Sequence, residues 1–183
     1  MARQLFVYDP PERFVVGTVG EPGERVFYLQ ARAGARITTV VIEKLQAALL
    51  AEKITDLLDE ISRRHPDLQV ADVSSGIDDL DALEVPILED FRAGALGLGW
   101  NSITDRVVIE AHGSDGEEVP DIEDDSDEEA PDCLRVRITA TMARAFARRA
   151  AAVVSAGRPP CPFCHLPLDP GGHICPRANG YRR

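Results

Sequence analysis

Four short runs of strand character occupy the first part of the chain. Each run is rich in Val, Ile, Phe, Tyr and Thr, and the turn signals DPP, EPG and AGA separate them. The runs cover residues 4–8, 14–20, 25–31 and 36–43. Short β-prone runs joined by tight turns are typical of hairpins. The sequence therefore predicts four antiparallel strands before Lys44.

From Lys44 onward the hydrophobic period becomes that of a helix. The apolar residues fall on one stripe at helical spacing, made of Leu45, Leu49, Ile54, Leu57, Leu58 and Ile61. Charged residues occupy the other positions. Pro66 stops the helix, because the residue before a proline is pushed out of the helical backbone region. The pattern predicts one amphipathic helix that ends at His65.

The second part of the chain follows the same order of elements. An irregular, acidic stretch over residues 67–90 is expected to be a connection. Strand patterns then resume, and a helix follows them, over residues 91–100, 106–112, 134–139 and 141–155. Gly157 and the proline pair after it stop this last helix.

These elements predict an α+β fold with two antiparallel β-meander-plus-helix units. The core covers residues 1–157, with units at about 1–66 and 87–157, and a small arm follows at 158–183. In order, FVVGTVG, RVFYLQA and RITTVVIEKLQAAL of the first unit correspond to FRAGALG, RVVIEAH and RVRITATMARAFARRA of the second. An internal duplication explains this correspondence, and chance similarity between short strands explains it equally well.

The negative charge of the chain is concentrated in one segment. The net charge is −11, yet residues 115–132 hold 11 of the 31 acidic side chains and no Lys or Arg. The remaining 20 acids balance 20 bases, so the rest of the chain is neutral. Blocks of like charge repel one another and have little to bury. We expect an acidic, solvated loop over residues 114–132, and a basic partner for it is the alternative.

Three of the four cysteines lie within residues 161–175, in CPFCHLPLDPGGHIC. Zn²⁺ prefers four tetrahedral ligands drawn from thiolate and imidazole. Cys161 and Cys164 have the two-residue separation that lets a tight turn hold one metal, and His173 and Cys175 follow a Pro/Gly-rich turn. Four protein ligands leave no position open for water. The sequence therefore predicts a structural zinc site that staples the arm.

Two alternatives remain for these residues. His165 can replace His173 as the imidazole ligand, or the cysteines can be free thiols in a tail without metal.

Cys133 stands apart between the acidic segment and a strand. No His or other base adjoins it in sequence, so we expect a small buried apolar residue there and not a nucleophile.

Several segments also resemble a known family. They are YDPPERFVVGTVGEPGERVFYLQAR, EDFRAGALGLGW, RVVIEA and GRPPCPFCHLPLDPGGHICPRANGYRR. Together they resemble an uncharacterised family of actinobacterial conserved hypothetical proteins, a domain of unknown function. The resemblance covers nearly the whole chain and implies a bacterial, cytoplasmic protein with a Cys/His zinc-type tail. It supplies no activity.

Three functions are compatible with these patterns. The first is a cytoplasmic binding or adaptor module with a protein partner, since no apolar run is long enough to cross a membrane and the N-terminus lacks a signal-peptide core. The second is an enzyme with a site between the two units, for which Arg13, Arg32, Trp100 and His112 are candidates without a supporting motif. The third is a single-stranded nucleic-acid-binding protein, which the neutral core and 5% aromatic content disfavour.

Overall fold

The structure is a computed structural model that describes residues 3–65, 79–114, 120–127, 129–157, 160–165, 168, 175 and 177. Its elements in chain order are β1 (Leu5–Tyr8), β2 (Arg13–Val19), β3 (Val26–Ala33), β4 (Arg36–Ile42), α1 (Lys44–Arg64), β5 (Phe91–Asn101), β6 (Arg106–Gly113), β7 (Cys133–Ile138) and α2 (Ala140–Ser155). All of them lie within a residue or two of the ranges that the sequence predicts.

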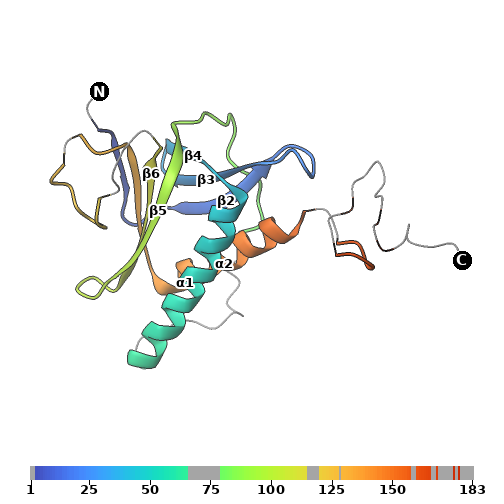
Figure 1. Cartoon of the computed structure of the whole chain (residues 1–183). Coiled ribbons are helices and arrows are strands. Elements are labelled where there is room, and N and C mark those ends of the chain that lie inside the picture. The colour runs from blue at the N-terminus through green and yellow to red at the C-terminus, as the bar shows by residue number, and fades with distance from the viewer. Residues whose placement is uncertain are drawn as a thin grey trace, which may run out of the picture.

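The strands form one sheet in the order β1-β7-β6-β5-β4-β3-β2. The strands β2, β3 and β4 make one antiparallel meander, and β5, β6 and β7 make another. The two meanders meet through a short parallel pairing of Val40 with Phe91 and Val41 with Arg92. Figure 1 shows β2, β3 and β4 running across β5 and β6. The α+β class is confirmed, and the internal duplication stays a prediction.

The first strand is not part of the first meander. β1 pairs in parallel with β7, and Leu5 lies opposite Cys133 in the register. The predicted antiparallel pairing of four consecutive strands is therefore wrong for β1. The side chains of β1 also reach the middle of the sheet, because the Phe6 ring stacks on Phe91 at 6.1 Å and the Tyr8 hydroxyl lies 2.8 Å from that of Thr38. A partner so distant in sequence leaves no local signal.

The two helices cross each other on the same side of the sheet (Figure 1). α1 begins with a capping box between Glu43 and Gln46 and ends at His65, as predicted. Its buried residues are Ala47, Leu50, Ala51, Ile54, Leu58 and Ile61. The predicted stripe also contained Leu45 and Leu49, which are 67% and 46% exposed. The stripe is wrong at these two positions, because Ala47 and Ala51 are the buried residues in this part of the helix, together with Leu50.

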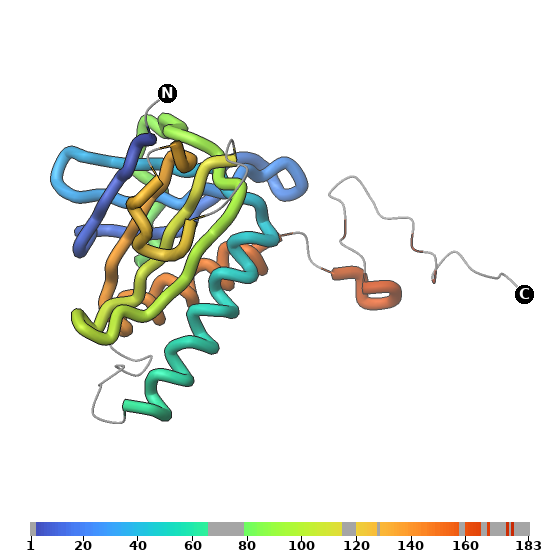
Figure 2. Tube along the Cα trace, turned by 60° about the vertical axis from the view of Figure 1, so that its left-hand side comes forward, coloured from blue at the N-terminus to red at the C-terminus, as the bar shows by residue number. Residues whose placement is uncertain are grey.

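Two connecting segments cover the other face of the sheet. Residues 79–90 lie over the first meander, where Leu83 packs with Val15, Tyr28 and Val41. Gly17 makes room for Leu83, since a Cβ atom on Gly17 would overlap its side chain. Over the second meander, the side chain of Ile122 lies against Gly97 and Gly99, 3.3 Å and 3.2 Å from where their Cβ atoms would be. In Figure 2 the segment around Ile122, in gold, lies in front of β5 and β6.

The described part of the acidic segment is held to the sheet by ion pairs. Asp125 accepts two hydrogen bonds of 2.9 Å from Arg135, and Glu123 accepts one of 2.7 Å from Arg137. Residues 120–127 are therefore anchored to the sheet, while most of them stay exposed to solvent. Within the described residues, no helix is long and apolar enough to cross a membrane.

Candidate metal centre

Three cysteines come together beyond the end of α2. The Sγ atoms of Cys161, Cys164 and Cys175 all lie within 4.8 Å of one another. Cys161 and Cys175 are buried, and their Sγ atoms are 3.8 Å apart. None of the three is in a disulfide. A cluster of reduced thiols with this spacing can hold a metal ion.

The spacing of the sulfurs fits a tetrahedral zinc site. A Zn–S bond is about 2.3 Å long, so two thiolates on one tetrahedral ion lie about 3.8 Å apart. The Cys161–Cys175 pair has this separation. The structure therefore brings together three of the four predicted ligands. The fourth, His173, lies outside the described residues, and its role stays a prediction.

The tight turn between Cys161 and Cys164 favours the thiolate form of Cys161. The backbone N–H of His165 donates to the carbonyl of Cys161 at 2.9 Å, and His165 has a φ of 60°. Hydrogen bonds from the backbone N–H groups of Cys164 and Phe163 outweigh burial and lower the pKa of Cys161 to about 6. A thiol that ionises near neutral pH is a good metal ligand. His165 is not part of the cluster that the described residues form.

A second cluster combines residue types that are used in nucleophilic catalysis. Glu110, His112 and Cys133 offer ligand or proton-transfer atoms within 4.8 Å of one another. Glu110 binds the His112 Nε2 at 3.0 Å, the Arg135 guanidinium, and the backbone N–H of Glu123 at 3.1 Å. One sequence signal could have indicated this cluster: charged residues stand at alternate positions of the apolar strands β6 and β7. Their cross-strand contacts were not predicted.

This second cluster is fully buried. The exposed fractions of Glu110, His112 and Cys133 are 0%, 1% and 0%, so a substrate has no access to them. Burial, followed by the charge of Glu110, raises the pKa of Cys133 to about 11. A thiol in this state is a poor nucleophile. The buried apolar role predicted for Cys133 agrees with its position in the core.

Alkylation distinguishes Cys133 from a reactive cysteine. At pH 8 its pKa of about 11 leaves about one thiol in a thousand ionised. We expect iodoacetamide to leave Cys133 unmodified in the native protein at pH 8 and to modify it in guanidinium chloride, as read by peptide mass spectrometry. Modification of native Cys133 at the rate of a free thiol would contradict the assignment.

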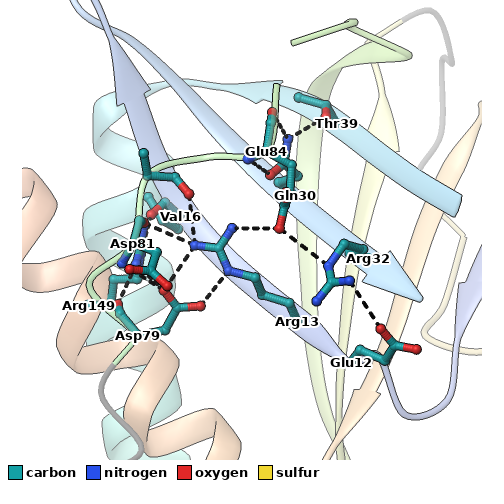
Figure 3. A network of polar contacts seen from close by, with 11 residues as sticks. Glu12, Arg13, Val16, Gln30, Arg32, Thr39, Asp79, Asp81, Glu84 and Arg149 are labelled. Carbon is teal, nitrogen blue, oxygen red and sulfur yellow. Dashed lines mark hydrogen bonds and ion pairs between the residues drawn. The ribbon is translucent and has the colours of Figure 1, made fainter. Parts of the chain in front are cut away.

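Two of the four residues considered for an enzyme site meet: Arg13 and Arg32 lie opposite each other in β2 and β3, and both pair with Glu84 Oε1, at 3.5 Å and 3.4 Å. Arg13 binds Asp79 at 2.9 Å beside Arg149, as Figure 3 shows, and lines a cavity of about 100 Å³. Arg32 also pairs with Glu12 at 3.2 Å. The remaining two, Trp100 and His112, do not line the cavity of Arg13. The ion pairs and hydrogen bonds of Arg13 and Arg32 hold residues 79–84 against β2 and β3.

The fold and the thiol cluster define an α+β protein with a small cysteine-rich candidate metal centre. The chain matches the family described as "Protein of unknown function (DUF3090)" over residues 6–175, and it belongs to this family. Comparison with curated proteins and with solved structures found no match. The family match covers all three clustered cysteines and assigns no activity.

Proposed function

We propose that the C-terminal segment holds one structural Zn²⁺ through Cys161, Cys164, Cys175 and His173. The observation that carries this proposal is the 3.8 Å separation of the Cys161 and Cys175 sulfurs, with Cys164 in the same cluster. Three cysteines and one histidine complete a tetrahedron and leave no position for water or substrate. The metal therefore supports the local fold and does not take part in a reaction.

We further propose that the protein is a cytoplasmic adaptor that uses this zinc-stapled segment to contact a protein partner. Phe163 supports this role, because it lies between two of the ligand cysteines and is 61% exposed. An aromatic side chain on a rigid support binds with little loss of conformational entropy and is a frequent anchor in interfaces. The carbonyl of Phe163 accepts a hydrogen bond from Arg177 at 3.1 Å, which links the turn to residues after the last cysteine.

One variant tests the proposed partner contact of Phe163 without changing the proposed zinc ligands. Phe163→Ala removes the exposed ring and retains every proposed ligand, so the purified variant should carry one zinc per chain by elemental analysis. Affinity capture from lysate should lose the partners that the wild-type chain retains. Equal partner sets for wild type, Phe163→Ala and a chain ending at Gly157 would refute the adaptor role, and zinc-free wild-type protein would refute the metal site.

A further inference from the structure

A cavity of about 320 Å³ lies where the two meanders and the two helices meet. The turn before β3, the start of α1, the start of β5 and the end of α2 each contribute to its wall. Part of the lining is apolar and includes Phe27, Ile42, Val153 and Val154. Ligand pockets usually combine such an apolar wall with a few convergent polar groups.

The polar groups of this cavity are mostly cationic. Arg25, Lys44 and Arg92 line it, and Glu43 is the one acidic residue that does so. Arg25 donates to the carbonyl of Ala156 at 3.0 Å, and Arg92 pairs with Glu43 at 2.9 Å. Two of the three cations are thus held in place by other groups. The lining has an excess of two positive charges in a chain whose net charge is −11.

Lys44 is the cation without a partner. Within the described residues, its ammonium makes no hydrogen bond or ion pair, and it lies 3.4 Å from the position that a Cβ atom on Gly157 would take. Lys44 is also the first residue of α1. The first turn itself has no acidic side chain, and the N-cap Glu43 that precedes it pairs with Arg92. A cation is unfavourable at a helix N-terminus, because the macrodipole is positive there. A bound anion would remove this repulsion and would give Lys44 a partner.

We propose that this cavity binds a small phosphate monoester with a compact apolar body. A phosphate monoester carries about −1.5 to −2 charges near pH 7, which matches the excess of two positive charges in the lining. Arginine and lysine are the usual phosphate ligands. The apolar wall takes the body of the molecule, and the volume of about 320 Å³ fits a small ligand.

Lysine chemistry gives a direct test, because Lys44 and Lys53 are the only lysines of the chain. Reductive methylation with ¹³C-formaldehyde keeps the charge and labels each lysine for NMR. Lys44→Arg and Lys53→Arg assign the two signals by their absence. We expect phenyl phosphate to shift the Lys44 signal with saturation, at a dissociation constant of about 1 mM or lower. The Lys53 signal should stay, since Lys53 pairs with Asp56 at 3.2 Å on the exposed side of α1.

Matched ligands and variants complete the test. Inorganic phosphate should bind more weakly than phenyl phosphate, and phenol should not shift the Lys44 signal. In unlabelled protein, Lys44→Gln should weaken phenyl phosphate binding in calorimetry at least tenfold, and Lys53→Gln should leave it unchanged. Equal shifts of both lysine signals, or no shift, would overturn the proposal. Lys44-dependent binding to phosphatidic acid vesicles without binding of phenyl phosphate would also overturn it.

Discussion

Removal of the proposed metal is expected to unfold the segment around Cys161 and to leave the α+β core folded. A segment this small has almost no apolar core of its own, so the proposed metal would supply most of its folding free energy, about 10 kcal/mol by analogy with zinc-finger peptides. The hydrogen bonds from the backbone of Phe163 and Cys164 to the Cys161 sulfur depend on that fold. Hydrogen exchange should therefore show these two amides protected with zinc and unprotected after chelation.

Two cysteine variants test whether the metal causes this protection. Cys161→Ser should abolish zinc binding and expose the same amides without chelator. Cys133→Ser is the matched control, because Cys133 lies in β7 and belongs to a different cluster. It should keep one zinc per chain and normal protection at Phe163 and Cys164. Protection that survives chelation would show that the fold of this segment does not need a metal.

Truncation of Arg135 is expected to cause the largest loss of stability in the core. Arg135 is 2% exposed and pairs with Glu110, which is fully buried, and with Asp125. Arg135→Ala leaves the Glu110 carboxylate buried without its cation. Breaking a buried pair in this way costs about 3–5 kcal/mol. Urea unfolding of the variant should show a corresponding decrease in the free energy of unfolding.

Arg137→Ala is the control for this effect. Arg137 lies two residues further along β7 and pairs with Glu123, but its side chain is 21% exposed, so its removal should cost about 1 kcal/mol or less. A double variant, Glu110→Gln with Arg135→Met, should recover part of the loss, because it removes both charges. Equal losses for Arg135→Ala and Arg137→Ala would contradict a buried ion pair.

The pH dependence of stability should have the same origin. Burial opposes ionisation of Glu110, but its hydrogen bonds with His112 and Arg135 outweigh burial and lower its pKa. The pKa values of Glu123 and Asp125 are lowered too, because their hydrogen bonds with arginines outweigh desolvation. Carboxylates with lowered pKa values stabilise the fold above their unfolded-state pKa, and this contribution is lost as the pH falls through the folded-state value. Arg135→Ala should therefore weaken the loss of stability in acid.

The elements of this fold could be predicted from the sequence because their signals are local. Alternation, helical periodicity, turn residues and the position of Pro66 depend on neighbouring residues, and they gave both helices and all seven strands. The grouping of Cys161, Cys164 and Cys175 was predicted for the same reason, since a short loop with Pro and Gly keeps nearby ligands together.

The tertiary structure alone decided which strands and charges are partners. β1 looked like the first strand of the first meander, yet it pairs with β7 at the far edge of the sheet. The acidic segment was predicted to be a solvated loop, and the structure adds that its Glu123 and Asp125 pair with Arg137 and Arg135. Both results depend on contacts between residues far apart in the chain. Such contacts form only when the sheet buries one face under the helices and leaves charged residues on the other face to be covered.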